Sequence, residues 1–334
     1  MKYLFWLLIT IFSLPILLFA SDPSPDELTD IIVDFSPKQI KEFKNLADNG
    51  DAKAQLIIGL IKRVTRNSAR KSYQNGQEAL AWIEKSAKQN YAPAQWFLFD
   101  ICENRFQRND EIGEAKICNE KNSFLEKAIS VNYPAAIWYQ GLFYEEGKNV
   151  PQDSKKAIEL YKKSGDLGYS WAYYRIGRIC EEGIGLDKNQ ADANIWYLKA
   201  AEFGEATAQD TIAVRISEGI GTKSNNIEAV KWFKKSAEQG HVYGSCNLAL
   251  HYARGWGIKK NPLLALKWSM ISNSLDSLKC HPDDYVEFLK PRKAIIKRAS
   301  SLALRWLRQH RNLTNNFDER PWLGDGEKPI TYRF

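Results

Sequence analysis

Apolar residues recur along most of the chain at steps of three or four positions, a spacing that predicts amphipathic helices. In the stretch from Ala172 to Glu181, for example, Ala172, Ile176, Gly177 and Cys180 fall on one helical face. Several such stretches end at a pair of glycines, which suit a chain leaving a helix through a left-handed conformation. The next stretch then begins after Asp or Asn, whose side chain can accept hydrogen bonds from the first helical amides. The pattern therefore predicts helices in pairs.

The same residue types return every 36 positions, in five columns that share one register. The columns are Gly147, Gly183, Gly219 and Gly255; Ala157, Ala193, Ala229 and Ala265; Trp196, Trp232 and Trp268; Ala136, Ala172, Ala208 and Gly244; and Asp153, Asn189, Asn225 and Asn261. A single helix pair cannot bury its own apolar stripe, so neighbouring pairs must stack. We predict an all-α fold, an α/α solenoid wound as a right-handed superhelix of about six helix pairs.

Less regular segments flank and precede the clear repeats. We expect N-terminal capping helices in residues 21–50, including one from Pro37 to Asn49, and the solenoid in residues 51–276. The two early repeats are longer, and we place their extra residues in loops at 66–75 and 105–113. A C-terminal capping helix is predicted in 277–311, running unbroken from Asp284 to about Arg311, followed by a loose tail at 312–334.

The first twenty residues resemble an export signal. Lys2 precedes an apolar run from Tyr3 to Phe19, and Ala20 ends it. We interpret residues 1–20 as a signal peptide cleaved after Ala20, which predicts a periplasmic or secreted protein. An uncleaved membrane anchor is the alternative, because the run is just long enough to span a bilayer.

Five cysteines raise the question of disulfides in an exported chain. Cys102 and Cys118 bracket a short polar segment and are a candidate pair. Cys180 and Cys246 fall on first helices two repeats apart, too far for a bridge. Pairing of Cys246 with Cys280 is marginal, and structural thiols remain the default reading for these residues.

The repeat resembles the Sel-1-like family, relatives of the tetratricopeptide repeats. The residues that carry the resemblance are Ala136, Gly141, Tyr144, Gly147, Asp153, Ala157, Tyr161 and Gly168, and, one repeat later, Ala172, Gly177, Gly183, Gly185, Ala193, Trp196, Tyr197, Ala200, Ala201 and Gly204. Asn149 departs from the pattern where a second glycine is expected, and Ala213 and Ala249 replace a glycine. The resemblance implies a protein-binding adaptor or scaffold of the bacterial envelope or the secreted fraction. It also leaves two alternatives: a periplasmic immunity protein against a secreted toxin, and a β-lactamase-like enzyme of the family's cysteine-rich branch, whose regular Cys pairs this chain lacks.

The chain shows no arrangement of residues that points to catalysis. Its four His form no metal-binding spacing, and no Ser lies in a nucleophile motif. The Gly-x-Gly turns end helices and do not open them after a strand, unlike phosphate-binding loops. We therefore predict a non-enzymatic protein with no cofactor and no metal.

Tetratricopeptide-like stacks line their concave face with residues of the first helices, and the register selects candidates there. They are Trp96, Asp100, Trp138, Trp171, Tyr174, Arg178, Asp210 and Tyr243. Trp and Tyr are favoured anchors in protein interfaces, so this aromatic run is a candidate strip for an extended partner segment. The alternative is that the rings pack between helices as core.

Net charge is +7, and the segment from Glu287 to Arg311 is strongly basic. This helix could contact an anionic surface or an acidic protein. A solvated helix face is the alternative. Nucleic acid is not expected as a partner, because the helix lacks interleaved aromatics and the chain carries an export signal.

Overall fold

A computed structural model describes residues 35–64, 69–106, 116–275 and 290–310. Every element in these ranges is a helix, and they contain no strand, which confirms the expected all-α solenoid class. None of the described helices combines the length and the apolar character needed to cross a bilayer. The expected signal peptide and C-terminal tail lie outside the described residues.

The chain divides into two compact units, Met1–Leu142 and Phe143–Phe334. The helices of unit 1 are α2 (Pro37–Asp48), α3 (Ala52–Val64), α4 (Ala69–Lys88), α5 (Ala92–Phe106), the short 3-10 helix η1 (Lys116–Glu120), α6 (Lys121–Ser130) and most of α7 (Pro134–Glu146). Consecutive helices from α2 to α6 pack against one another. The expected helix from Pro37 is thus present as α2.

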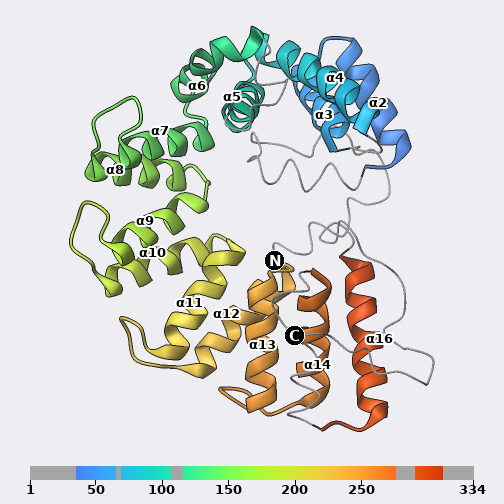
Figure 1. Ribbon diagram of the computed structural model, residues 1–334, viewed down its shortest axis with the longest axis vertical. Helices are drawn as coiled ribbons and strands as arrows, with labels where there is room; N and C mark the ends of the chain where they lie inside the picture. The colour runs from blue at the N-terminus through green and yellow to red at the C-terminus, as the bar shows by residue number, and fades with distance from the viewer. Residues whose placement is uncertain (1–34, 65–68, 107–115, 276–289, 311–334) are drawn as a thin grey trace, which may run out of the picture. The chain divides into compact units, whose positions relative to one another are not determined.

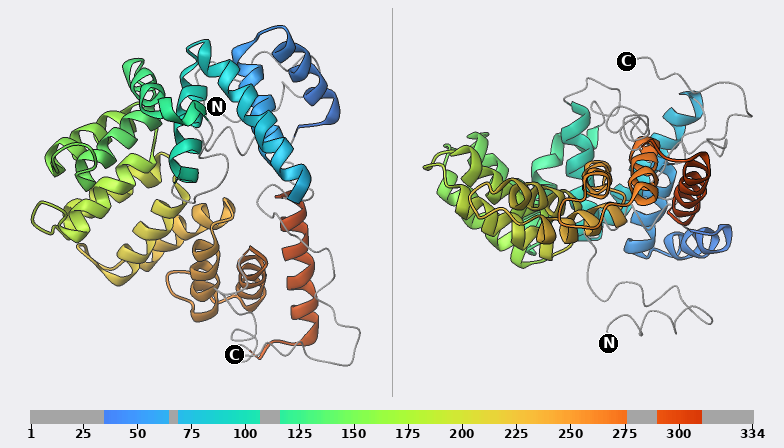
Figure 2. Two further views of the ribbon diagram at one scale, coloured as in Figure 1. Left: turned by 45° about the horizontal axis from the view of Figure 1, so that its top comes forward. Right: turned by 90° about the horizontal axis from the view of Figure 1, so that it is seen from below.

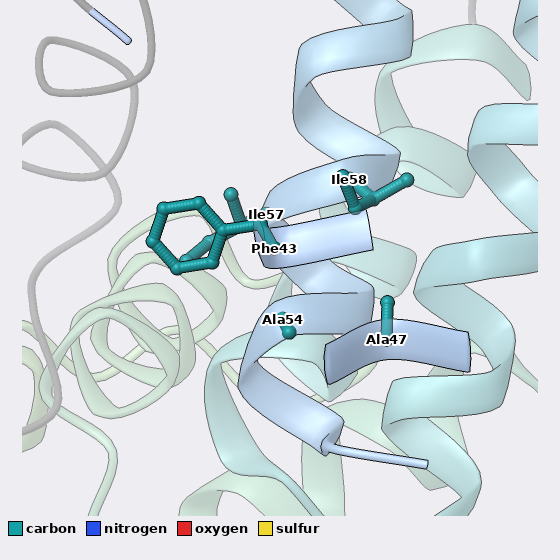
Figure 3. Packing of buried hydrophobic residues seen from close by; sticks show 5 residues of the cluster. All are labelled: Phe43, Ala47, Ala54, Ile57 and Ile58. Carbon is teal, nitrogen blue, oxygen red and sulfur yellow. The ribbon is translucent and has the colours of Figure 1, made fainter. Parts of the chain in front are cut away.

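Unit 1 begins with a small apolar cluster between α2 and α3. Phe43 and Ala47 of α2 meet Ala54, Ile57 and Ile58 of α3, and all five are buried (Figure 3). Ser36 starts α2 with a capping box: it accepts from the Gln39 amide, and its own amide donates to Gln39 Oε1 at 2.9 Å. The cap fixes where α2 begins, and the cluster holds it on α3.

Unit 2 contains the regular repeats, as antiparallel helix pairs that follow one another along the chain (Figures 1 and 2). Its helices are α8 (Ser154–Asp166), α9 (Trp171–Glu182), α10 (Gln190–Glu202), α11 (Ala206–Glu218), α12 (Asn226–Glu238), α13 (Val242–Arg254), α14 (Pro262–Leu275) and α16 (Lys293–Gln309). Figure 1 shows α13, α14 and α16 in a row, and α16 packs on α14. The alanine columns supply buried residues in each pair, and the buried aromatics are Tyr161, Tyr197, Phe233, Trp232 and Trp268, whereas Trp196 is half-buried.

The predicted caps of unit 2 are confirmed. Asp153, Asn189, Asn225 and Asn261 each accept a hydrogen bond from an amide two or three residues later, at 3.0–3.2 Å. The first glycine of each pair closes a first helix in the left-handed conformation, with φ between 69° and 80°. Asn149 holds the place of a second glycine and still adopts the left-handed conformation, with φ 62°, as Asn tolerates.

The second glycine of each pair has another task, because it lies against the start of the second helix one repeat earlier. A Cβ added at Gly221 would lie 2.7 Å from the carbonyl oxygen of Gln190, the first residue of α10. Gly257 faces the backbone of Asn226, the first residue of α12, in the same way, and Gly185 faces the side chain of Ser154, the first residue of α8. The glycine pair therefore ends a helix and also lets its loop approach the previous repeat.

Two expectations about element boundaries are wrong. Residues 66–75 were expected to form a loop, yet α4 begins at Ala69 and runs for 20 residues, so at least part of the extra length extends a helix. The C-terminal helix is not continuous from Asp284, because 290–292 are not helical and α16 starts only at Lys293. Pro291 explains the break: the residue before a proline is pushed out of the helical region, and Lys290 has φ 44°.

Cys102 of α5 and Cys118 of η1 form a disulfide, as the sequence suggested, with their Cα atoms 5.2 Å apart. Cys180 is a buried free thiol. Cys246 is disulfide-bonded, so Cys180 and Cys246 do not pair, as expected. The suggested partner, Cys280, lies outside the described residues.

Candidate functional site

We define the first-helix face of unit 2 as the face of α9, α11 and α13 that carries the candidates Trp171, Tyr174, Arg178, Asp210 and Tyr243. On α9, Trp171 and Tyr174 are one helical turn apart and their rings stack, with centroids 4.7 Å apart and planes at 23°. Both side chains are half-buried. The Tyr174 ring also packs on the ring of Tyr197 of α10, with centroids 5.2 Å apart. One ring of the stacked pair is therefore supported by the second helix.

The other polar and aromatic candidates of this face are more open. Arg178 forms an ion pair with Glu182 one turn along α9, where both side chains are partly exposed. Tyr243, at the start of α13, is 48% exposed and lies beside the ring of His241, with centroids 5.9 Å apart. About half of the Tyr243 side chain is therefore accessible to a partner.

Asp210 lies on α11 and is only 8% exposed. Its Oδ1 accepts a hydrogen bond of 2.9 Å from Asn247 Nδ2 of α13. Burial raises the pKa of the Asp210 carboxyl to about 6, although the hydrogen bond from Asn247 acts in the opposite direction. Asp210 has no cationic partner among the described residues, unlike the buried carboxylates Glu103 and Glu145, which pair with Lys121 and Arg175.

The remaining candidates lie in unit 1. Trp96 of α5 is 5% exposed and packs between Phe99 and Tyr139, with both centroid distances 5.6 Å. Trp138 of α7 is half-buried against Tyr139 at 6.0 Å, and Asp100 of α5 is half-buried. Trp96 thus belongs to the core of unit 1, leaving a partner at most the edge of its ring. The expected aromatic run divides between the two units, and within unit 2 it comprises Trp171, Tyr174 and Tyr243.

A buried polar contact that the sequence pattern did not predict joins α7, α8 and α9. Glu145 of α7 is nearly fully buried; its Oε2 accepts from the Tyr161 hydroxyl of α8 at 2.7 Å and from Arg175 Nε of α9 at 2.9 Å. Arg175 Nη2 donates to the second oxygen of Glu145 at 2.5 Å. Burial, then the Glu145 charge, raises the pKa of Tyr161 far above its usual range, which keeps the hydroxyl a donor. The buried carboxylate is fully paired, as burial of a charge requires.

The contact recurs one repeat later with a change. Tyr197 of α10 donates to Glu181 of α9 at 2.6 Å, and both residues are 36 positions after their counterparts. The cation is Arg215 of α11, which pairs with Glu181 and also donates to Gln190 Oε1 at 2.6 Å. Arg215 lies four residues beyond the position equivalent to Arg175. We call each three-helix set of acid, tyrosine and arginine a clasp.

In the third repeat the same positions lose their charge. Ser217, Phe233 and His251 occupy the places of Glu181, Tyr197 and Arg215. His251 is buried, its ring is 4.8 Å from Phe233, and its Nε2 is 3.4 Å from Ser217 Oγ. Burial lowers the pKa of His251 below its usual value, so the imidazole is a neutral core group here.

Among the described residues, no set of three or more His, Cys, Asp and Glu side chains is grouped closely enough to hold a metal ion.

Helix pairs in one 36-residue register, with glycine-paired loops and capped second helices, define an α/α repeat protein. A model of the Sel1 repeat family matches residues 71–91, 134–169, 172–204, 212–241 and 242–269. The chain belongs to the Sel1 repeat proteins, and the resemblance noted in the sequence is confirmed. Sel1 repeats are generally non-catalytic and mediate protein–protein interaction. No curated protein matches the chain at the sequence level.

Solved structures support the same fold. A protective antigen of uropathogenic Escherichia coli with an SLR fold is 22% identical, with a TM-score of 0.58 over 81% of this chain and 56% of that protein. The chain thus spans little more than half of that relative's length. A Sel1 repeat protein from Oxalobacter formigenes is 22% identical, with a TM-score of 0.52 over 81% of this chain and 98% of that one. An immunity protein from Pseudomonas aeruginosa reaches a TM-score of only 0.32 at 19% identity, over 55% of this chain and 72% of that one, and it carries no argument for the immunity alternative.

Proposed function

We propose that this protein is a protein-binding adaptor of the bacterial envelope or the secreted fraction, and that a protein partner binds the first-helix face of unit 2. The observation that carries the proposal is the placement of three aromatic rings on first helices. Trp171 and Tyr174 form a stacked, half-buried pair on α9, and Tyr243 is exposed on α13.

These rings have the properties of interface anchors. Aromatic side chains offer a large contact area with few rotatable bonds, and Trp, Tyr and Arg dominate interface hot spots. Tyr174 is already immobilised on Tyr197, so a partner would pay little entropy to order it. Arg178, one turn beyond Tyr174, adds a cation at the edge of the pair.

Asp210 suggests one property of the partner. Its carboxylate is costly to keep charged, because burial is opposed only by the hydrogen bond from Asn247. A Lys or Arg side chain from the partner would supply the missing cation and favour the charged form. We therefore expect a basic residue in the segment that covers α11.

The disulfides support the export part of the proposal. Cys102 and Cys118 are bridged, and Cys246 is also disulfide-bonded. Structural disulfides persist in oxidising compartments such as the periplasm or the extracellular space. This agrees with the apolar run from Tyr3 to Phe19 read as an export signal.

Site-specific photo-crosslinking in the native host tests the binding face. A photoreactive phenylalanine analogue would replace Tyr243 in one strain and Ile227 in another. Ile227 is 65% exposed at the start of α12, a second helix, and is the matched control. We expect a discrete adduct of higher mass from position 243 and none from position 227. Adducts that are the same at both positions, or absent from both, would refute the proposed face.

A second substitution links the adduct to the stacked pair. Trp171→Ala removes one ring of the pair, and we expect it to lower the yield of the position-243 adduct about tenfold or more, as loss of a hot-spot residue does. Ile195→Ala, which truncates an exposed residue of α10, is the control and should leave the yield unchanged. An equal yield of the position-243 adduct in Trp171→Ala and wild type would show that the stacked pair is not part of the binding site.

A further inference from the structure

The outer side of α16 carries a concentration of unpaired positive charge. Between 290 and 310 the chain has seven Lys and Arg residues and no Asp or Glu. All seven are exposed, and none forms an ion pair with a described residue. They are Lys290, Arg292, Lys293, Lys297, Arg298, Arg305 and Arg308.

Several cations elsewhere in unit 2 are used within the fold. Arg175 and Arg215 pair with buried or half-buried carboxylates. Lys235 lies over the ring of Trp232 at 3.9 Å, and Lys267 over Trp268 at 4.1 Å. The cations of α16 have no such role in holding the described structure together, so their concentration on one helix calls for another explanation.

The helix is strongly two-sided, and its apolar side is already occupied. Ala299, Ala303, Trp306 and Leu307 are buried, and α16 packs on α14, where the Trp306 ring lies edge-on to Trp268 at 5.9 Å. At 100° per residue, the five cations within α16 fall on an arc of about 140° on the opposite side, with only small residues, Ala294 and Ser301, exposed between them. The helix therefore presents a cationic strip about 25 Å long.

We propose that this strip docks the protein, through electrostatic contact alone, on the anionic headgroups of a lipid bilayer. A lipid surface fits better than an acidic protein, because the strip offers no aromatic anchor: Trp306, the one aromatic ring of α16, faces α14. Flexible Lys and Arg side chains suit a flat, laterally adaptable layer of negative charge. Insertion into the bilayer is not involved, because the apolar side of α16 is buried in the fold.

Vesicle co-sedimentation of the full chain tests the proposal. Vesicles of phosphatidylcholine alone are compared with vesicles of phosphatidylcholine and phosphatidylglycerol. Each is tested at about 50 mM and about 500 mM salt, because the Debye screening length becomes several-fold shorter over this range. The neutral vesicles account for any binding by the apolar run near the N-terminus. We expect the chain to bind the anionic vesicles preferentially and to be released at high salt.

Two triple variants separate the strip from net charge. In K297Q/R305Q/R308Q three cations of the strip are neutralised, and in the control K155Q/K163Q/K223Q three exposed lysines elsewhere in unit 2 are neutralised. Both have the same net charge. At about fivefold per cation near an anionic surface, the strip variant should bind anionic vesicles about 100-fold more weakly than wild type, whereas the control should change by less than about fivefold. Circular dichroism confirms that both variants fold.

Three results would overturn the proposal. Equal losses in the two variants would mean that net charge, and not the strip, drives binding. Equal wild-type binding to neutral and anionic vesicles would mean that α16 is not the contact. In parallel assays, binding of polyaspartate or duplex DNA by the strip without any binding to anionic vesicles would assign the strip to an acidic protein or to a nucleic acid instead.

Discussion

The Tyr161 hydroxyl lies 2.7 Å from Glu145 Oε2, and this bond joins α8 to α7 at a fully buried position. Tyr197 and Glu181 repeat the relationship 36 residues later, so the clasp belongs to the repeat itself. Each clasp reaches a third helix through an arginine. The clasps hold successive helix pairs in register with polar contacts, whereas the alanine and aromatic columns provide the apolar packing.

Loss of the clasp arginine should destabilise unit 2. Arg215 is 3% exposed, and Arg215→Ala would leave Glu181 without its cation. Breaking a buried pair costs about 3–5 kcal/mol, and we expect the lower part of this range because Glu181 is 33% exposed and can be hydrated. Urea unfolding followed by circular dichroism measures the free energy of unfolding.

Arg178→Ala is the matched control, because the exposed pair of Arg178 and Glu182 should contribute only about 0.5 kcal/mol. Similar losses of unfolding free energy in the two variants would show that the clasp contributes no more to stability than an exposed ion pair.

Asp210→Asn should stabilise the protein at neutral pH. The pKa of the folded Asp210 carboxyl is about 6, above its ordinary 3.8, so the folded state holds a proton that the unfolded state releases. The stability of the wild type therefore falls as pH rises from about 4 to about 6 and stays lower above that window. This difference between the folded and unfolded pKa corresponds to roughly 3 kcal/mol of unfolding free energy.

The asparagine does not titrate and can still accept the hydrogen bond from Asn247. The difference in unfolding free energy between Asp210→Asn and wild type should therefore grow as the pH rises from about 4 to about 7. Linkage gives an increase of a few kcal/mol. Urea titrations at several pH values measure it. A difference that stays constant with pH would contradict the raised pKa.

Gly257→Ala should be far more harmful than Gly204→Ala. Both glycines have positive φ, 64° and 103° respectively. At Gly257, however, a Cβ would also strike the backbone of Asn226 and Ile227, whereas at Gly204 it would meet nothing within 4 Å. We expect a loss of about 1–2 kcal/mol for Gly204→Ala from backbone strain alone and at least twice that for Gly257→Ala. Thermal or urea unfolding compares them, and equal losses would mean that close approach of the loop is unimportant.

The disulfide of unit 1 should stabilise that unit measurably. Cys102 and Cys118 are 16 residues apart, and closing a loop of this length contributes about 3 kcal/mol in the chain-entropy model. Cys102→Ser should therefore lower the unfolding free energy of unit 1 by roughly that amount. Cys180→Ser, at the free thiol, is a control for loss of a cysteine. A variant at Cys102 as stable as wild type would show that the bridge adds nothing.

The repeat register was enough to predict much of the fold. It placed the caps at Asp153 and Asn225 and the glycine pairs that end first helices, because each of these residues acts on its own backbone within a few positions. The sequence also offered Cys102 and Cys118 as a candidate pair, and the two are bridged.

What the register could not supply depends on contacts between repeats. Glu145 and Glu181 share a column, but their arginines come from positions one helical turn apart, so periodicity alone could not pair them. Trp96 occupies the same repeat position as Tyr174. It is nevertheless enclosed by Phe99 and Tyr139, two rings with no counterpart in later repeats. Of the candidate site, the stacked pair and Tyr243 remain as predictions to be tested.

The bridge between α5 and η1 also alters what backbone cleavage would do. A protease that cut the chain once anywhere between Cys102 and Cys118 would leave two polypeptides joined through sulfur. The cleaved protein would run as a single species on a denaturing gel without reductant and as two fragments once a thiol is added. Unit 1 can therefore survive an internal cut in one covalent piece, as long as its surroundings stay oxidising.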